Sequence, residues 1–301
     1  MDLSLIIAFC REHGLIYKSP QKTADLVSIK VGGNASLVVY PFSLEKLIAI
    51  VKMLINNKIR FYILGNGTNT YFSENDFEGI IIVTKLINKC TLDNNSIIAE
   101  CGASLYECCV LARDNSLSGI EFAYGIPGTV GGALYMNASA FGSSVSLCVK
   151  ESLVLDKNTL QVYTIDSYSH SFEEKKSVFS KMNDLIVLST VFSLKQAQKE
   201  EISAKMEGYM NKRVNSQPLD MPSAGSVFKK PQGNYASHLI DSAGLRGLRV
   251  GGAMVSEKHA GFIVNLGNAT AGDIQSLTQF IKEIILKKYN VKLEEEIIFV
   301  E

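Results

Sequence analysis

The stretch Gly125-Ile-Pro-Gly-Thr-Val-Gly-Gly-Ala-Leu-Tyr-Met-Asn-Ala138 carries four glycines and one proline in its first eight residues and then continues with mainly apolar side chains. Glycine lets the main chain adopt a positive φ and lets another group come close to the backbone. Bare backbone N–H groups are donors that suit a pyrophosphate. The stretch therefore indicates a phosphate-binding loop, and the alternative is a tight turn with a purely architectural role.

Two further glycine clusters favour the binding interpretation. Val31-Gly-Gly-Asn34 follows residues 26–30, which we predict to form a short strand, and Leu64-Gly-Asn-Gly-Thr-Asn69 follows a predicted strand at 60–64. The dinucleotide fingerprint G-x-G-x-x-G is not met, because its third glycine would fall on Thr70 and no helix is expected to open there. A dinucleotide bound by this chain is thus not expected to be held as in a Rossmann fold.

Composition narrows the class of protein. A chain of 301 residues is long enough for two or three domains, and its 30 basic and 30 acidic residues cancel, so no overall field attracts nucleic acid or an anionic membrane. The apolar residues 3–10 lack a basic leader and are too short to span a bilayer, so we predict an amphipathic first helix. Six cysteines without C-x-x-C spacing predict reduced thiols in a cytoplasmic protein rather than a disulfide framework or a metal site.

Hydrophobic periodicity predicts mixed helices and strands. Helices are expected at 43–57, from Ser104-x-x-Glu107 to about 115, at 200–215 and at 270–289, where Thr270-x-x-Asp273 has capping-box spacing; strands are expected at 153–155, 161–165, 185–194 and 296–300. We predict three domains from this order: 1–85, 86–195 and 196–301.

Ser226 is the candidate for chemistry in the third domain. It lies between Gly225 and an apolar pair, in a segment flanked by Pro222 and Pro231. No G-x-S-x-G elbow surrounds it, and the histidines at 13, 170, 238 and 259 show no recognisable pairing with it, which disfavours a nucleophile and favours a proton donor. The acidic run 294–296 could supply a charged neighbour, and its alternative is a solvated charged end.

Several of these motifs together resemble the UDP-N-acetylenolpyruvoylglucosamine reductase (MurB) family over nearly the whole chain. The strings are VGGNA, LGNGTN, SGIEFAYGIPGTVGGALYMNASAFG, QPLDMPSAGSVFKKP, HLIDSAGLRGLRVGGAMVSEKHAGFIVN and LEEE, in the family's order. The resemblance is to the short form of the family. It implies an α+β fold, with a two-subdomain FAD-binding part of the vanillyl-alcohol-oxidase (PCMH) type and a C-terminal α/β substrate-binding domain.

The resemblance also implies an activity. NADPH would reduce FAD, and hydride would then pass to the enolpyruvyl β-carbon of UDP-N-acetylglucosamine enolpyruvate, giving UDP-N-acetylmuramate for peptidoglycan synthesis, cell wall biogenesis, cell shape and cell division. The protein supplies orientation and electrostatics to such a cofactor. The partners expected are this UDP-sugar and NADPH, with no nucleic acid, no membrane insertion and no metal, in a monomer.

Matching positions give the residues that the resemblance implies. Ser226 would protonate the neighbouring carbon, Glu296 would help to polarise the substrate, and Lys229, Lys230 and His259 would bind the substrate. The FAD-binding positions would be Gly32, Gly33, Gly65, Asn66, Gly67, Thr68, Asn69, Gly125, Pro127, Gly128, Thr129, Gly131, Gly132 and Asn137.

One motif departs from the family pattern. Glu174-Lys-Lys-Ser177 stands where Tyr-Arg-x-Ser is usual, so Lys175 occupies the position of the catalytic arginine, and Lys230 replaces a common asparagine. Lysine keeps the charge but lacks the planar fork that holds a carboxylate. Lys176, Arg213 and Arg246 are alternative basic groups. The alternative function is a diverged flavoprotein that keeps FAD but has lost or altered the reductase activity.

Overall fold

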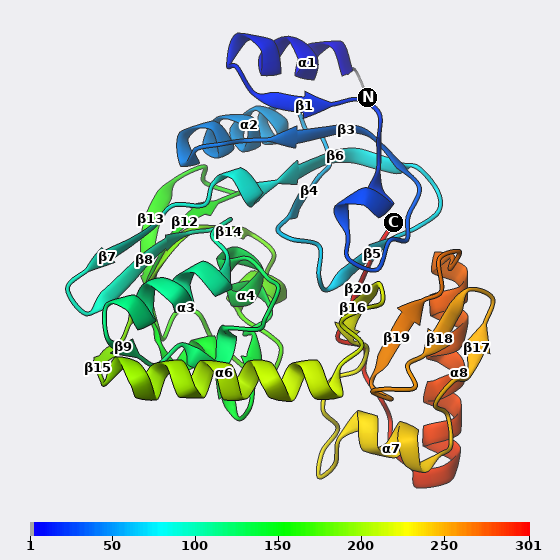
Figure 1. Cartoon of the computed structure of the whole chain (residues 1–301). Coiled ribbons are helices and arrows are strands. Elements are labelled where there is room, and N and C mark those ends of the chain that lie inside the picture. Colours follow the sequence, from blue (N-terminus) through cyan, green and yellow to red (C-terminus); the bar gives the residue numbers. More distant parts are fainter. Residues whose placement is uncertain (1–2) are drawn as a thin grey trace. The chain divides into compact units, whose positions relative to one another are not determined.

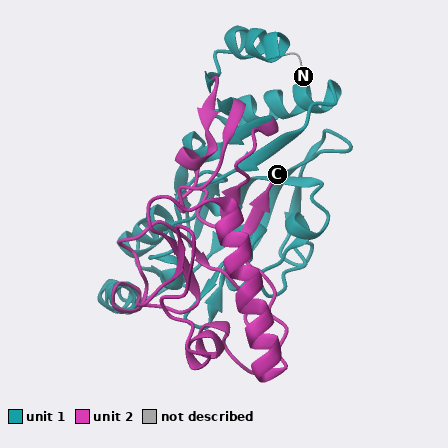
Figure 2. Ribbon diagram, turned by 90° about the vertical axis from the view of Figure 1, so that its right-hand side faces the viewer, with its two compact units in different colours: residues 1–18, 37–66, 79–212 teal, residues 19–36, 67–78, 213–301 magenta. Residues whose placement is uncertain are grey.

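The computed structural model describes residues 3–301, which divide into two compact units. Residues 3–18, 37–66 and 79–212 form unit 1, and residues 19–36, 67–78 and 213–301 form unit 2 (Figure 2). Unit 2 is therefore built from two short N-terminal segments and the C-terminal third of the chain. The domain boundaries expected after residues 85 and 195 stay a prediction.

The elements follow one another as labelled in Figure 1. The helices are α1 (Leu3–Glu12), α2 (Leu44–Asn56), α3 (Leu105–Asp114), α4 (Val130–Tyr135), α5 (Val178–Lys181), α6 (Lys199–Ser216), α7 (Ala236–Ser242) and α8 (Ala271–Tyr289). The strands are β1 (Ile16–Lys18), β2 (Gln21–Lys22), β3 (Asn34–Tyr40), β4 (Phe61–Leu64), β5 (Thr70–Phe72), β6 (Phe77–Val83), β7 (Cys90–Asp93), β8 (Ser96–Glu100), β9 (Leu117–Ser118), β10 (Ser139–Ala140), β11 (Ser143–Ser144), β12 (Val149–Asp156), β13 (Val162–Asp166), β14 (Leu185–Ser193), β15 (Lys195–Gln196), β16 (Ser223–Ser226), β17 (Arg249–Val250), β18 (Ala253–Val255), β19 (Phe262–Asn265) and β20 (Ile298–Val300).

Unit 1 contains the first sheet, in the order β1-β3-β6-β4. Strands β4 and β6 run parallel, with Phe61 opposite Ile80, whereas β1 pairs antiparallel with β3. Helix α2 begins where the Ser43 hydroxyl accepts a hydrogen bond from the N–H of Lys46, and its buried side chains recur at the helical period, at Leu47, Ile50, Val51 and Leu54. This unit of helix and strand is the one that the periodicity of residues 43–64 predicts.

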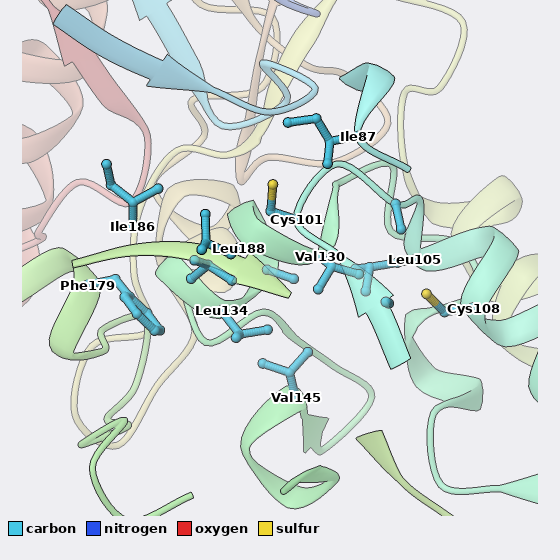
Figure 3. Close-up of a cluster of buried hydrophobic side chains, with 14 of the residues drawn as sticks. Ile87, Cys101, Leu105, Cys108, Val130, Leu134, Val145, Phe179, Ile186 and Leu188 are labelled. Carbon is cyan, nitrogen blue, oxygen red and sulfur yellow. The ribbon is translucent and has the colours of Figure 1, made fainter. Parts of the chain in front are cut away.

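The second sheet of unit 1 is entirely antiparallel, in the order β13-β12-β14-β8-β7. Helices α3 and α4 pack on it, and Figure 3 shows their apolar side chains gathered with those of the sheet. Leu105 of α3, Leu134 of α4 and Leu188 of β14 are all 0% exposed. This packing fixes α4, whose first turn contains Gly131 and Gly132 of the glycine-rich stretch.

Unit 2 contains an antiparallel sheet in the order β16-β19-β18-β17, with α8 packed on β17 and β18. Helix α8 begins with the predicted capping box, in which Thr270 and Asp273 each accept a hydrogen bond from the other's backbone N–H. Strand β20 pairs in parallel with β5, so that Val300 lies opposite Phe72. The last strand of the chain is thereby joined to a segment of the N-terminal half.

The prediction of a strand at 26–30 is wrong. Val27, Ile29 and Val31 are buried and alternate with less buried residues, which explains the strand-like pattern. However, Thr23–Leu26 forms a 3₁₀ turn, and Lys30 has a φ of 60°, a left-handed conformation outside the strand region. At Ser104 the predicted helix start is confirmed, but the hydroxyl accepts from the N–H of Tyr106 and no reciprocal pair forms with Glu107.

The other predicted helices and strands are confirmed, with ends that differ from the predicted ones by at most four residues. Among residues 3–301, no helix is long and apolar enough to cross a membrane. The same residues contain no group of three or more His, Cys, Asp or Glu side chains arranged to hold a metal ion.

Asn265 is a polar residue on which unit 2 depends. Its side chain is 4% exposed and donates to the carbonyl oxygens of Ile29 and Lys30, at 2.9 and 3.4 Å. Its Oδ1 accepts from the N–H groups of Gly267 and Ala269, at 2.7 and 2.9 Å. A single amide thus joins residues 29–30 to the loop after β19.

We expect Asn265→Ala to lower the free energy of unfolding by roughly 2–4 kcal/mol, because it leaves buried backbone groups without partners. Asn268→Ala, at an exposed position of the same loop, is the matched control and should change little. Denaturant titration of both variants gives the comparison, and equal unfolding free energies would contradict the role assigned to Asn265.

Candidate functional site

Two of the glycine clusters meet within unit 1. The side-chain amide of Asn66 donates to the carbonyl oxygen of Pro127 at 2.6 Å. A methyl group on Gly65 would overlap Oγ1 of Thr129, so the two loops pack backbone against side chain. The structure therefore brings residues 65–66 and the stretch 125–132 together.

The glycines of this stretch are needed for different reasons. Gly131 donates its N–H to the carbonyl oxygen of Cys101 at 2.8 Å, and a methyl group there would press on Cys101. Thr129 caps α4 by accepting from the N–H of Gly132 at 3.3 Å. Gly128 has neither constraint, since its φ is not left-handed and an added methyl group would meet only Ile126, at 3.8 Å. The protein itself therefore gives no reason for a glycine at 128, and the role of Gly128 in cofactor binding stays a prediction.

Three of the predicted glycines, Gly32, Gly33 and Gly67, lie in unit 2 and serve its backbone packing. Gly33 lies against the backbone of Glu74 and donates to the carbonyl oxygen of Ser73 at 2.8 Å. Gly67 has a φ of 64° and lies against the backbone of Leu26. Gly32, with a φ of 150°, lies against Thr23. An architectural reason therefore accounts for these three glycines, and their role in cofactor binding stays a prediction.

Unit 2 brings Ser226 and the acidic run together. The N–H of Glu296 donates to the carbonyl oxygen of Val227 at 2.7 Å, and the N–H of Lys229 donates to that of Glu294 at 2.9 Å. Ser226 is thus adjacent to the residue that binds Glu296, and both side chains are half-buried. The alternative of a solvated charged end does not hold for Glu296.

A bulge directs Ser226. Between Ser223, opposite Val264, and Ser226, opposite Phe262, β16 has one residue more than β19. Gly225 sits in this bulge with a φ of 78°, which glycine adopts without strain. Bulges re-aim a side chain and often lie beside active sites. The glycine of the Ser-Ala-Gly-Ser sequence is therefore required by the backbone that presents the serine.

Asn69 binds the backbone of the acidic run at residues 294–296. Its side-chain amide donates to the carbonyl oxygen of Glu296 at 3.0 Å, and its own carbonyl oxygen accepts from the N–H of Ile298 at 2.9 Å. The Ser28 hydroxyl similarly donates to the carbonyl oxygen of Ser223 at 2.6 Å. These contacts join residues about 195 and 227 positions apart, and no sequence signal pointed to Ser28.

The three predicted substrate-binding side chains have partners within unit 2. Lys229 forms an ion pair with Glu294 at 3.5 Å, and Nζ of Lys230 lies 4.6 Å from the centre of the Tyr235 ring. Nδ1 of His259 accepts from the N–H of Gly261 at 3.1 Å. Burial, together with the positive charge of Arg246, lowers the pKa of His259, which favours a neutral ring.

The segment that carries Lys175 is fixed in unit 1. Glu173 and Lys176 exchange backbone hydrogen bonds of 3.0 and 3.2 Å, which makes Lys175 part of a tight turn with a φ of 56°. The Asn137 amide donates to the carbonyl oxygen of Glu173 at 2.8 Å, and the Ser177 hydroxyl donates to that of Tyr135 at 2.9 Å. The turn is therefore bound to the end of α4, and the Asn137 side chain, predicted to bind a cofactor, is used for this contact.

The alternative basic residues have other surroundings. Arg246 binds both carboxylate oxygens of Asp241, at 2.5 and 2.9 Å, and donates to the carbonyl oxygen of Glu257. Arg213 donates to the side chain of Gln217 at 3.2 Å, and burial lowers its pKa. Lys176 is exposed, whereas Lys175 is half-buried. Arg246 is thus held by a carboxylate, and the choice of Lys175 among these basic residues stays a prediction.

Sequence comparisons cover both units. The model of the C-terminal domain of UDP-N-acetylenolpyruvoylglucosamine reductase matches residues 217–300, and an FAD binding domain model matches residues 35–161. The UDP-N-acetylenolpyruvoylglucosamine reductase of Caldanaerobacter subterraneus is 42% identical over 287 residues, which cover 95% of this chain and 94% of that protein. The protein of the same name from Pseudothermotoga lettingae is 44% identical over 271 residues, or 90% and 93% of the two chains.

Solved structures agree with the fold prediction. The crystal structure of UDP-N-acetylenolpyruvylglucosamine reductase (MurB) from Thermus caldophilus matches with a TM-score of 0.81 and 29% identity, covering 95% of this chain and all of that one. Glucooligosaccharide oxidase from Acremonium strictum matches with a TM-score of 0.50 at 11% identity, over 96% of this chain and 60% of that one, a likeness of fold alone. The predicted α+β fold, with an FAD-binding part and a C-terminal domain, is confirmed.

The two glycines of the contacting loops should differ in their effect on stability. Gly65→Ala forces a methyl group against Thr129 and should lower the free energy of unfolding by about 1–3 kcal/mol, as overpacking does. Gly128→Ala adds a methyl group that makes only an ordinary van der Waals contact with Ile126, and it should stay within about 0.5 kcal/mol of the parent. Thermal and denaturant unfolding measure both, and a Gly128 variant as unstable as the Gly65 variant would show that the protein itself fills that space.

Proposed function

Because the chain belongs to the UDP-N-acetylenolpyruvoylglucosamine reductase family, we propose that it reduces UDP-N-acetylglucosamine enolpyruvate to UDP-N-acetylmuramate, using FAD and NADPH. The reaction would serve peptidoglycan precursor synthesis in the cytoplasm, and through it cell shape and division. We further propose that the chain acts as a monomer. The observation that carries the proposal is the pairing of the Ser226 segment with Glu296, in a chain that matches the two reductases named above over 95% and 90% of its length.

FAD fits the residues of the glycine-rich stretch. At Gly128 the protein leaves space where a side chain would stand, beside a backbone that carries N–H donors. Bound FAD supplies the hydride transfer between NADPH and the enolpyruvyl carbon. The loops 65–66 and 125–132 hold each other through Asn66 and Pro127, which keeps the proposed pyrophosphate contacts preorganised.

Ser226 is proposed as the proton donor and Glu296 as the group that polarises the substrate. A hydroxyl gives up its proton best when neighbouring groups stabilise the charge that develops. The proposal is supported by the backbone hydrogen bond from Glu296 to Val227, next to Ser226, and by the bond from Asn69 to the carbonyl oxygen of Glu296. The bulge at Gly225 sets the direction of the serine side chain.

Lys175 is proposed as the cation that faces the substrate carboxylate. Its backbone is in the left-handed region, a conformation that non-glycine residues adopt rarely and often at functional sites. The neighbouring Lys176 is exposed, and Arg246 is held by Asp241. Lys229, Lys230 and His259 are proposed to line the substrate-binding part of unit 2.

The alternative, a diverged flavoprotein without the reductase step, rests only on the change at residues 174–177. Nothing in the comparisons favours it, since the relatives with 42% and 44% identity are named as reductases. Purified protein tests the choice directly. We expect a yellow protein whose NADPH oxidation rises on addition of UDP-N-acetylglucosamine enolpyruvate, and a yellow protein without that rise would favour the alternative.

Ser226→Ala tests the proton donor. We expect the substrate-dependent rate to fall about 10²- to 10⁴-fold, the usual contribution of a general acid. Flavin content and NADPH oxidation without the sugar nucleotide should be unchanged, because neither needs this proton. Ser223→Ala, on the same strand, is the matched control. Equal losses in both variants would point to damage to the strand instead of loss of a donor.

Two substitutions test Lys175: one removes the positive charge, and the other keeps the charge but changes the shape of the group that carries it. Lys175→Ala should lower kcat/KM for the sugar nucleotide roughly 10- to 100-fold, the worth of a hydrogen bond to a charged group. Lys175→Arg should keep or raise it, since a guanidinium binds a carboxylate through two N–H groups. Lys176→Ala is the control. Steady-state kinetics decide, and a larger loss at Lys176 would move the role to that residue.

A further inference from the structure

A single histidine is buried in an otherwise exposed polar segment of unit 1. Residues 166–169, from the last residue of β13 onward, are all exposed, and Tyr168 reaches 89%, yet His170 is 0% exposed. The ring stacks on Phe172 at 5.0 Å and meets the edge of Phe179, which belongs to the core shown in Figure 3, at 5.7 Å. His170 is therefore the side chain by which this segment enters the body of the unit.

The buried ring is part of a chain of hydrogen bonds into the sheet. Nδ1 lies 2.6 Å from the carbonyl oxygen of Asp166, which can only accept, so Nδ1 carries the proton. Nε2 lies 2.8 Å from the Ser152 hydroxyl, and that hydroxyl lies 2.9 Å from the one on Thr190. Burial lowers the pKa of His170, so Nε2 accepts from Ser152, and Ser152 accepts from Thr190.

All three side chains are wholly buried, and each has its partner. Ser152, Thr190 and His170 are 0% exposed, on β12, on β14 and in the segment after β13. A buried polar chain that is fully paired specifies one arrangement, because any other arrangement leaves polar groups unpaired. The chain thus fixes His170, main chain included, to the central strands of the second sheet.

The backbone of His170 closes the loop that carries Lys175. Its carbonyl oxygen accepts from the N–H of Val178 at 2.8 Å, so residues 171–177 form a loop with His170 at its base. The far side of that loop is the turn at 173–176, bound to α4 through Asn137. Displacing His170 releases one of the points that hold this turn.

We propose that His170, together with Ser152 and Thr190, is a positioning residue for Lys175. The buried chain holds the base of the 171–177 loop, and the loop in turn holds the cation toward the substrate carboxylate. The inference rests on the proposed function for the role of Lys175, but the order that His170 gives to the loop is independent of that function.

The test compares His170→Phe with His170→Asn in the full-length protein. Phenylalanine keeps the ring contacts with Phe172 and Phe179 but loses both hydrogen bonds, whereas the asparagine amide can still donate to the carbonyl oxygen of Asp166. Amide hydrogen exchange should rise in peptides covering 171–177 of the phenylalanine variant, less so in the asparagine variant, and not in α8. Unchanged exchange at 171–177 would overturn the inference, whatever the activity.

Steady-state kinetics distinguish a positioning role for His170 from a role in stability alone. In His170→Phe we expect KM for the sugar nucleotide to rise roughly 10-fold, as for a displaced binding group, with kcat, flavin content and substrate-free NADPH oxidation nearly unchanged. In a Lys175→Ala background the same change should have no further effect on KM. An equal rise in that background, or loosened exchange with a normal KM, would overturn the inference.

Ser152→Ala provides a second variant if His170→Phe does not fold. It removes only the hydroxyl that binds Nε2. We expect the same changes in hydrogen exchange at 171–177 and in KM for the sugar nucleotide, but smaller ones. If both quantities stay unchanged, the inference is overturned. If the proposed function is wrong, the parent protein will show no substrate-dependent turnover. In that case the hydrogen-exchange measurement still decides whether His170 orders the 171–177 loop.

Discussion

The antiparallel backbone pairing of residues 227–229 with residues 294–296 is the constraint on which the candidate chemistry of unit 2 depends. It brings Ser226 and Glu296, which lie far apart in the sequence, close together through main-chain hydrogen bonds. The side-chain amide of Asn69 also donates to the backbone carbonyl oxygen of Glu296. The positions of both residues are therefore set by backbone groups, which every non-proline residue carries.

The glycines separate into groups with different physical reasons. Gly225 is required by a left-handed φ, Gly33 and Gly65 by neighbours that leave no room for a Cβ atom, and Gly128 by neither within the protein. The sequence pattern alone does not distinguish these glycines from one another. At Gly128 neither the backbone conformation nor a close neighbour requires a glycine, and its proposed role in cofactor binding stays a prediction.

Local signals predicted most of the elements, because helix periodicity and caps depend on neighbours within four residues. Thr270 and Asp273 formed their capping box as expected. The strand at 26–30 failed since alternating burial of Val27 and Ile29 arises without pairing to a neighbouring strand. Ser226 and Glu296 were found through a family resemblance, but the bonds of Ser28 and Asn69 span about two hundred residues, and no local pattern encodes them.

The parallel pair of β5 and β20 has a consequence for the order in which the protein matures. Residues 70–72 are synthesised early, yet their partner strand is residues 298–300, and Ser73 donates its N–H to the carbonyl oxygen of Val300 at 2.9 Å. Chains grow from the N-terminus, and distant pairings form late. Completion of unit 2 therefore waits for the synthesis of residues 298–300, and until then the edge of β5 that they cover has no partner strand, an arrangement that favours mispairing.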